Sequence, residues 1–239
     1  MKKTLKKNVF IITLIVVVAV LFSLKSIYAT PEIEEVISAS DVNNEYETLE
    51  NLEQKFTDVP VYSWYAQSVN VVTEKGIMSG ISESEFVPDG PVTRAMFTTI
   101  LYRLAGEPEA DNILVFDDID EDKYYYNAVK WAYTCGIIDG YTDYKFAPDE
   151  PITREQMVSI LYRFIRFDEY GVDIYDHLKI SEFSDFDSIS EYAVNHVEWA
   201  YENGLIRGIN GKFEPENNVT RAEMAIILER LVTSVMIVE

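Results

Sequence analysis

One block of sequence occurs three times in this chain, and this repetition constrains the fold more than any other feature. Each copy begins with a Phe and contains an Arg 38 residues later; the pairs are Phe56 and Arg94, Phe116 and Arg154, and Phe183 and Arg221. A single unit of this kind cannot bury its own apolar face, so neighbouring copies have to share a core. The sequence therefore predicts a repeat architecture over most of its 239 residues.

The copies share further landmarks between these two ends. Each has an Asp two residues after the Phe, a Gly-x-x-x-Gly segment, and a Pro six residues before the Arg. The Asp residues are Asp58, Asp118 and Asp185, and the segments run over 76–80, 136–140 and 204–208. A Gly that ends a helical pattern is typical of the left-handed cap position. We therefore expect a first helix in each repeat, over 64–75, 124–134 and 192–203.

A second helix in each repeat follows the Thr-Arg pair. Apolar residues recur there at i, i+3, i+4 and i+7: Phe97, Ile100, Leu101 and Leu104; Met157, Ile160, Leu161 and Phe164; Met224, Ile227, Leu228 and Leu231. Thr93, Thr153 and Thr220 are the expected N-caps, and Gln156 and Glu223 complete capping boxes in two copies. One apolar stripe per repeat predicts a mainly α fold of helix-loop-helix repeats, with three second helices around a pseudo-threefold axis.

The N-terminus has the pattern of a secretory signal. Four Lys residues precede an apolar run over 9–22, and a small residue, Ala29, follows where a signal peptidase would cut. We predict a signal peptide over 1–29 and an acidic linker over 30–55. An uncleaved membrane anchor is the competing interpretation, although the apolar run is shorter than the ~20 residues that span a bilayer.

Composition and charge exclude several functions. Removing residues 1–29 removes five Lys and no acid, which leaves 41 acidic and 15 basic residues, a formal charge of −26. Nucleic acid is therefore excluded as a bulk electrostatic partner. The acids over 117–122 resemble a calcium loop but lack its Gly and closing Glu, and His177 and His196 have no metal spacing. We expect no metal, no cofactor and no catalytic residues.

The recurring Arg at the first position of each second helix is unusual. A cation there opposes the positive end of the helix dipole, by ~0.3 to 1 kcal/mol. Beside free backbone N–H groups, however, a guanidinium makes a focused anion site that can hold a carboxylate through two hydrogen bonds. A salt bridge from Arg94, Arg154 or Arg221 to one of the many acids is the structural alternative.

These residues resemble an S-layer homology repeat. The resemblance is carried by Phe-Thr-Asp-Val at 56–59, Gly-Ile-Met-Ser-Gly at 76–80, Phe-Val-Pro-Asp at 86–89 and Val-Thr-Arg-Ala at 92–95, and it extends to repeats over 56–106, 116–166 and 183–233. The resemblance implies a three-pronged, mainly helical module that attaches exported proteins non-covalently to secondary cell-wall polysaccharide. In this family the polymer often carries a pyruvate ketal and binds in grooves between repeats.

The resemblance also implies which residues bind the polymer. A pyruvate ketal presents a carboxylate on a sugar, which suits an Arg, and aromatic rings stack on sugar faces. The candidate residues are Arg94, Arg154 and Arg221; Asp58, Asp118 and Asp185; Gly80, Gly140 and Gly208; and Trp64, Trp131 and Trp199. Core packing is the alternative for the tryptophans, since aromatic residues at helical spacing usually bury. The complete Thr-Arg-Ala-Glu signature occurs only in copy three.

The function that follows is cell-wall anchoring at a bacterial surface, by a secreted protein with no attached cargo domain and no enzyme activity. The expected partner is pyruvylated secondary cell-wall polysaccharide, with other surface proteins as further candidates and membrane contact only through an uncleaved signal segment. The alternative is an exported protein–protein adaptor of a surface-layer assembly. A small wall-modifying enzyme is the least favoured hypothesis, because the three repeats account for nearly the whole chain after residue 55.

Overall fold

The computed structural model describes residues 55–110, 114–167 and 180–235. The predicted signal peptide over 1–29 lies outside these residues, as does the predicted linker over 30–55 apart from Lys55. The described residues all belong to one unit, Glu53–Glu239. Within them no helix has both the length and the hydropathy that crossing a bilayer requires.

Two α-helices occur in each repeat, as predicted. They are α3 (Ala66–Glu74), α4 (Arg94–Leu104), α5 (Tyr126–Thr134), α6 (Arg154–Phe167), α7 (Val194–Glu202) and α8 (Arg221–Arg230). Short 3-10 turns cover Ile180–Glu182 and Phe186–Ser188, and a π-helical turn, Leu231–Val235, extends α8. The described residues contain no β-strand, only isolated bridges. The prediction of a mainly α fold is confirmed.

The ends of the first helices follow from their sequence signals. Each begins two residues later than predicted, after an N-cap without a side-chain hydrogen bond at Tyr65, Tyr125 or Ala193. Just beyond each helix lies a Gly with positive φ: Gly76 at 69°, Gly136 at 68° and Gly204 at 68°. The predicted left-handed cap is therefore present in all three copies.

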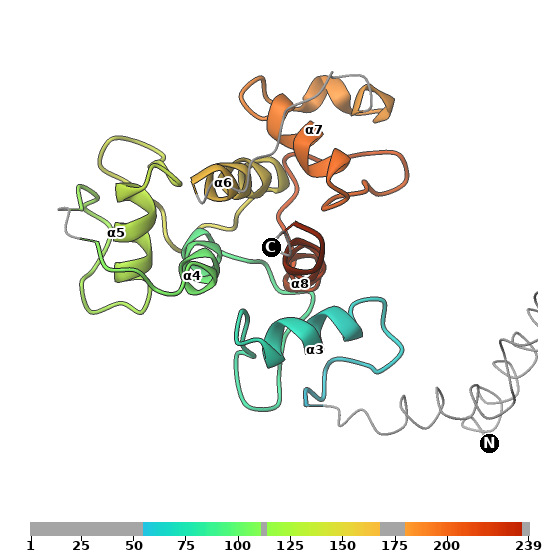
Figure 1. Cartoon of the computed structure of the whole chain (residues 1–239), viewed down its shortest axis with the longest axis horizontal. Coiled ribbons are helices and arrows are strands. Elements are labelled where there is room, and N and C mark those ends of the chain that lie inside the picture. The colour runs from blue at the N-terminus through green and yellow to red at the C-terminus, as the bar shows by residue number, and fades with distance from the viewer. Residues whose placement is uncertain (1–54, 111–113, 168–179, 236–239) are drawn as a thin grey trace, which may run out of the picture. The chain divides into compact units, whose positions relative to one another are not determined.

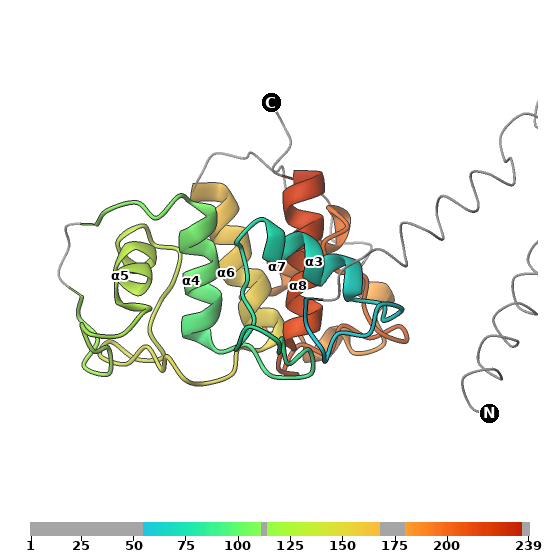
Figure 2. The ribbon, with the colours of Figure 1, turned by 90° about the horizontal axis from the view of Figure 1, so that it is seen from below.

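Close helix packing joins different repeats. α3 of copy one packs on α8 of copy three, α5 of copy two packs on α4 of copy one, and α7 of copy three packs on α6 of copy two. Figures 1 and 2 show α4, α6 and α8 running alongside one another, with α3, α5 and α7 outside them. Each outer helix therefore covers the inner helix of the preceding copy.

Backbone hydrogen bonds link the copies in the same order. Just before the inner helices, the N–H of Ile152 donates to the carbonyl of Val92 at 2.9 Å, and that of Val219 donates to Ile152 at 3.0 Å. The N–H of Val92 then donates to Val219 at 2.9 Å. These bonds join copy one to two, two to three and three to one, so the chain closes on itself between its first and last repeats.

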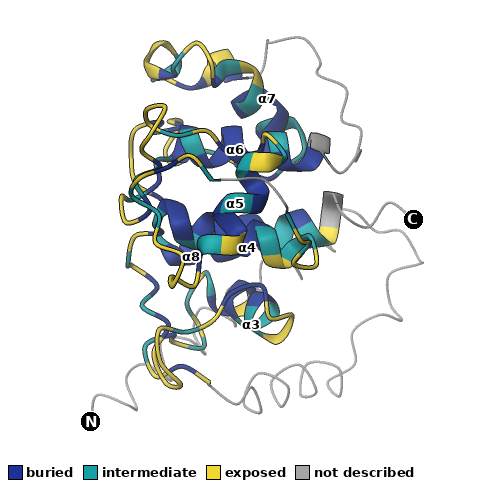
Figure 3. Cartoon of the chain, turned by 90° about the vertical axis from the view of Figure 1, so that its left-hand side faces the viewer, coloured by how far each residue is buried: buried dark blue, intermediate teal, exposed yellow. Residues whose placement is uncertain are grey.

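The predicted apolar stripes form much of the core. Every stripe residue of α6 and α8 is buried, including Leu231 just beyond α8, and so are Phe97, Ile100 and Leu101 of α4; Leu104 is half-buried. Figure 3 shows the inner helices mostly in the colour of buried residues. Burying a large aliphatic or aromatic side chain contributes ~1.5 to 3 kcal/mol. The stripes thus provide the shared core that a single repeat lacks.

Candidate ligand-binding site

The three predicted arginines are the first residues of α4, α6 and α8, and their side chains cross into the next repeat. Nε of Arg94 donates to the carbonyl of Phe146 at 2.9 Å, that of Arg154 to Phe213 at 2.7 Å, and that of Arg221 to Phe86 at 2.6 Å. All three residues are buried. The same contact therefore clamps each repeat to the following one.

Aromatic rings lie against the same guanidinium groups. The distances from the guanidinium carbon to the ring centroid are 4.6 Å for Arg94 over Phe146, 5.4 Å for Arg154 over Phe213 and 4.4 Å for Arg221 over Phe86. A second nitrogen also donates in two of the sites. Nη2 of Arg94 donates to the carbonyl of Asp139, and Nη2 of Arg221 donates to the carbonyl of Ser79. Burial lowers the pKa of Arg94 and of Arg221. The arginines therefore hold the repeats together.

The backbone N–H groups at the helix starts are not free, which corrects one part of the predicted anion site. The N–H of Arg94 donates to Glu150 at 3.0 Å, that of Arg154 to Asn217 at 2.9 Å, and that of Arg221 to Gly90 at 2.9 Å. The following N–H in each helix also donates to a carbonyl of the neighbouring repeat. These donors are satisfied by the interlocking of the copies, so only side chains remain to receive an anion here.

One pocket contains a predicted site residue and joins all three repeats. It has a volume of about 200 Å³ and is lined by Arg94 of copy one, by Asp139, Gly140, Tyr141, Gln156, Ser159, Ile160 and Arg163 of copy two, and by Tyr192 of copy three. We call it the Arg94 pocket. Its lining combines two guanidinium groups, two phenol rings, a carboxylate and an amide.

Contacts among the lining residues hold them in place. Nη1 of Arg163 lies 2.7 Å from Oδ2 of Asp139 and also donates to the carbonyl of Ile137 at 3.3 Å. The Gln156 amide donates to the Tyr141 hydroxyl at 3.1 Å, and the Tyr141 ring lies 4.7 Å from the guanidinium carbon of Arg94. Arg163 lies in the C-terminal half of α6, toward the end where the helix dipole favours a cation, and it is also part of the pocket.

A carboxylate found only in copy two positions Tyr192. Glu155 is buried, whereas the equivalent residues of the other copies are Ala95 and Ala222. It accepts hydrogen bonds from the Ser190 N–H at 3.0 Å, the Ser190 hydroxyl at 2.8 Å and the Tyr192 hydroxyl at 3.0 Å. Burial, together with the hydrogen bond and charge of Glu155, raises the pKa of Tyr192. The half-exposed ring therefore has a fixed position at the pocket.

The predicted aspartates organise loops beside the arginine clamps. Asp58 accepts hydrogen bonds from the N–H groups of Phe86 at 2.9 Å and Val87 at 2.6 Å. Burial opposes the charge of Asp58, but these bonds outweigh it and hold the pKa below its usual value. Asp118 and Asp185 make the equivalent pairs of bonds to residues 146–147 and 213–214. Their binding role stays a prediction.

The predicted glycines allow a close approach of ring and backbone. A Cβ atom added to Gly80 would lie 2.5 Å from the Phe56 ring, and one added to Gly140 or Gly208 would lie 2.6 Å from Phe116 or Phe183. No other residue fits there without displacing the ring. Gly140 also lines the Arg94 pocket, so the tight packing brings its backbone to the candidate site.

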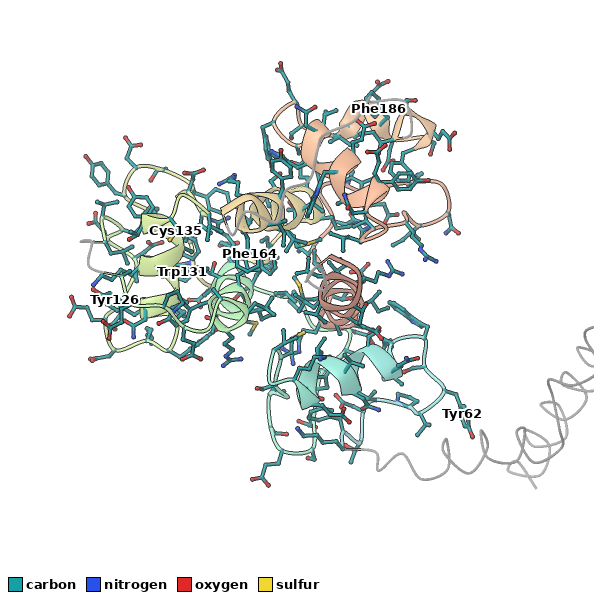
Figure 4. The ribbon with its side chains drawn as sticks, viewed as in Figure 1. Tyr62, Tyr126, Trp131, Cys135, Phe164 and Phe186 are labelled. Carbon is teal, nitrogen blue, oxygen red and sulfur yellow. The ribbon has the colours of Figure 1, made fainter. Side chains whose placement is uncertain are left out.

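The tryptophans do not have equivalent positions, and two of them correct the sequence-based expectation. Trp131 is 3% exposed and Trp199 is 1% exposed, so neither ring is available to stack on a sugar. Trp131 instead packs against Tyr102 and Phe164, with ring centroids 5.6 and 6.3 Å apart; Figure 4 labels Trp131 and Phe164. Core packing, the alternative interpretation, holds for both. Trp64 is 69% exposed and remains a candidate.

Sequence reasoning missed several residues of the pocket. Tyr141, Gln156 and Tyr192 come from three different segments, and only their spatial meeting marks them as a group. One signal was available for Tyr192. It occupies the register position of Trp64 and Tyr124, and all three side chains are exposed aromatics. This recurrence of an exposed aromatic residue is the signal that could have marked Tyr192 as a candidate.

A larger hollow on copy three is less suitable for an anionic ligand. It has a volume of about 470 Å³, and its lining includes Asp185, Glu214 and Glu216 against one cation, Lys212. The Asp185 carboxylate already accepts two backbone hydrogen bonds. This excess of negative charge would repel a carboxylate, so the Arg94 pocket is the better candidate.

Comparison with known proteins identifies the repeats. A model of the S-layer homology domain matches residues 55–96, 115–158 and 182–225. An endoglucanase of Bacillus sp. (strain KSM-635) is 33% identical over 75% of this chain and 19% of its own length. An amylopullulanase of Thermoanaerobacterium thermosulfurigenes is 34% identical over 70% of this chain and 9% of its own.

Surface-layer proteins match in the same way. The surface-layer 125 kDa protein of Lysinibacillus sphaericus is 29% identical over 76% of this chain and 15% of its own length. The chain thus spans less than a fifth of each of these three relatives. S-layer homology domains are non-catalytic modules that anchor proteins to the bacterial cell wall, and this family places the protein at a bacterial cell surface. The chain belongs to the S-layer homology domain family.

Proposed function

We propose that the three repeats form a pseudo-threefold, three-pronged module that binds pyruvylated secondary cell-wall polysaccharide in the grooves between repeats. The observation that carries this proposal is the Arg94 pocket, where side chains of all three copies meet. Its guanidinium groups would bind the carboxylate of the ligand, and its phenol rings would contact the sugar that carries this carboxylate. The cyclic order of hydrogen bonds among the copies supports the pseudo-threefold arrangement.

The chemistry of the pocket suits a sugar that carries a carboxylate. Two nitrogens of Arg94 are committed to carbonyls, and no acceptor for its Nη1 is present in the described part of the chain. A ketal carboxylate would receive a charge-assisted hydrogen bond there. The half-exposed rings of Tyr141 and Tyr192 offer apolar faces to the sugar, and the Gln156 amide offers polar contacts to its hydroxyl groups.

Binding to an anionic polymer has to be short-range. The chain beyond residue 29 carries a formal charge of −26, which repels a polyanion beyond contact distance. At physiological salt this repulsion is screened beyond ~8 Å, whereas contacts inside a pocket are screened much less. We therefore expect moderate salt to leave affinity unchanged or to raise it, the opposite of the behaviour of a basic polymer-binding patch.

The alternative function is an exported adaptor that binds another surface protein. Large exposed rings outside the Arg94 pocket favour it: Tyr62 is 78% exposed and Tyr144 is 64% exposed. Figure 4 shows Tyr62 pointing away from the ribbon of its repeat. Substituting these rings separates the two functions, because they do not line the pocket.

Co-sedimentation with isolated cell walls tests the proposed function. The protein should sediment with walls that keep their secondary polymer and remain in solution with walls stripped of it. Tyr141→Ala, which removes one ring of the pocket, should weaken binding, while Tyr144→Ala serves as the matched control three residues away. Equal binding to stripped walls, or loss of binding only in the Tyr144→Ala variant, would contradict wall-polymer binding in this pocket.

A further inference from the structure

The three arginine sites differ most at one register position, the third residue of each inner helix. This position holds Met96 in α4, Gln156 in α6 and Glu223 in α8. Its side chain meets the arginine of the preceding copy: Gln156 lines the pocket of Arg94, and Glu223 contacts Arg154. By the same register, Met96 belongs to the site of Arg221. The three sites thus offer an apolar, an amide and a carboxylate neighbour.

At Arg154 the carboxylate is already in place. Oε1 of Glu223 lies 3.2 Å from Nη1 of Arg154, and the two side chains are 19% and 7% exposed. The other oxygen, Oε2, accepts hydrogen bonds from the Thr220 N–H at 2.9 Å and from the Thr220 hydroxyl at 3.1 Å. Because the capping box fixes Glu223 at the start of α8, its carboxylate cannot turn away without breaking the cap.

The equivalent donor is unoccupied in the other two sites. Arg94 and Arg221 use Nε and Nη2 for backbone carbonyls, and in the described segments Nη1 of neither residue has an acceptor. Neither arginine makes an ion pair within those segments. The atom that contacts Glu223 in Arg154 is therefore the atom left for a ligand in Arg94 and Arg221.

We infer that the third residue of the inner helix decides whether the preceding arginine accepts an external carboxylate. The Arg94 and Arg221 sites bind the ligand, and the Arg154 site is closed by the chain's own Glu223. This inference rests on the proposed function, because it assigns the ligand carboxylate to Nη1. The closing carboxylate comes from copy three, the copy with the complete Thr-Arg-Ala-Glu signature.

The physical reason is competition between two carboxylates for one donor. A ligand carboxylate would have to displace Glu223 or lie against its negative charge, and displacing it would also break two hydrogen bonds of the cap. Of the cations on copy three, Arg230 donates to the carbonyl of Leu205 at 3.0 Å, and its pKa is lowered first by burial and then by the charge of the exposed Arg207.

Arginine side-chain NMR measures the three sites separately. The protein would carry ¹⁵N-arginine, with Arg94, Arg154 and Arg221 assigned through single Arg→Lys variants. The probe is a methyl hexopyranoside that carries a pyruvate ketal, and the same glycoside without the ketal is its control. In the unaltered protein the ketal should shift the guanidinium signals of Arg94 and Arg221 and leave that of Arg154 in place.

Two exchanges between copies provide the matched variants. Glu223→Gln gives α8 the residue of α6, where Gln156 still exchanges hydrogen bonds with Thr153 at 3.4 Å, so the helix start should persist. The Arg154 signal should then respond to the ketal. The reverse change, Gln156→Glu, should abolish the response of Arg94 and leave that of Arg221. Unchanged shifts of the core methyl groups would show that the variants remain folded.

The outcomes separate this inference from the proposed function. An Arg154 signal that moves in the unaltered protein as much as those of Arg94 and Arg221 overturns the inference and leaves the function standing. If the ketal does not shift the Arg154 guanidinium signal in a folded Glu223→Gln variant, the inference is also overturned. No response from any arginine, together with no binding of the polymer, overturns the proposed function itself.

Discussion

The side chain of Arg94 binds the backbone of Phe146 in the following repeat: its Nε donates to the Phe146 carbonyl at 2.9 Å, and its guanidinium lies 4.6 Å from the centroid of the Phe146 ring. The same pair recurs at Arg154 with Phe213 and at Arg221 with Phe86. Each arginine is thus a clamp between copies as well as a candidate ligand contact. This double role determines which substitutions are informative.

Replacing Arg94 with Ala should lower the free energy of unfolding by about 3 kcal/mol or more. The change removes two hydrogen bonds from a charged donor, at ~1.5 to 3 kcal/mol each, and leaves two carbonyls without their partner. Urea unfolding measures the effect. Arg103→Ala, at an exposed side chain, is the control and should cost under ~0.5 kcal/mol. Equal stability of the two variants would contradict the clamp.

Replacing Gly140 with Ala should destabilise the protein more than replacing Gly136. The new methyl group at Gly140 would lie 2.6 Å from the Phe116 ring and 2.7 Å from the Lys145 carbonyl, so we expect ~1 to 3 kcal/mol from overpacking. Gly136 has open space but a φ of 68°, and Ala there costs ~1 to 2 kcal/mol. Thermal unfolding compares the two, and a larger loss at Gly136 would show that close packing does not limit residue 140.

Replacing Glu155 with Ala should weaken ligand binding by about five-fold, the equivalent of ~1 kcal/mol. The change removes the acceptor that fixes Tyr192 at the Arg94 pocket, yet it gives α6 the residue present at this position in copies one and three. Tyr192→Phe keeps the ring and loses only its hydrogen bond, so it should bind better than Tyr192→Ala. Calorimetry with wall polymer measures these affinities. Unchanged affinity in the Glu155→Ala variant would show that ligand binding does not depend on the hydrogen bond between Glu155 and Tyr192.

Stability should fall as the pH drops below about 6.5 because of His196. Burial, and then the charge of Arg163, lowers its pKa from 6.5, while Nδ1 contacts the Ser159 hydroxyl at 3.0 Å. The unfolded chain therefore binds a proton at a higher pH than the folded protein does, so acid favours unfolding. The contribution is fully present above pH 6.5 and is lost as the pH falls toward the lower folded pKa.

Urea unfolding at several pH values between 7.5 and 5 tests this prediction. His196→Gln should flatten the slope in that interval, since its side chain does not titrate. A slope that persists unchanged in the variant would assign the effect to another group.

The sequence predicts much of this fold because its signals are local. The predictions of the apolar stripe around Leu101, of the Thr93 cap and of the glycine after each first helix are confirmed, since each depends on residues within a few turns of one another. The pairing of α3 with α8 was not predicted. Every copy carries the same stripe, so the pattern cannot say which outer helix covers which inner one.

The candidate site is less predictable because it depends on contacts between copies. The positions of Arg94, Arg154 and Arg221 at the helix starts were correct, but their carbonyl partners lie 45 to 142 residues away in sequence. Trp131 and Trp199 share the residue type of Trp64 but lie on the inner side of their helices, and burial removes them from the site. Glu155 belongs to no repeat pattern, so only the structure reveals its bond to Tyr192.

Calorimetric titration of the protein with purified secondary cell-wall polysaccharide, before and after mild acid removal of its pyruvate ketals, tests carboxylate recognition. We expect saturable binding to the intact polymer and its loss once the ketals are removed, because the carboxylate is the group that the arginines bind. Equal binding to both forms would contradict recognition of the carboxylate. Absence of binding to either form would contradict wall anchoring through this polymer.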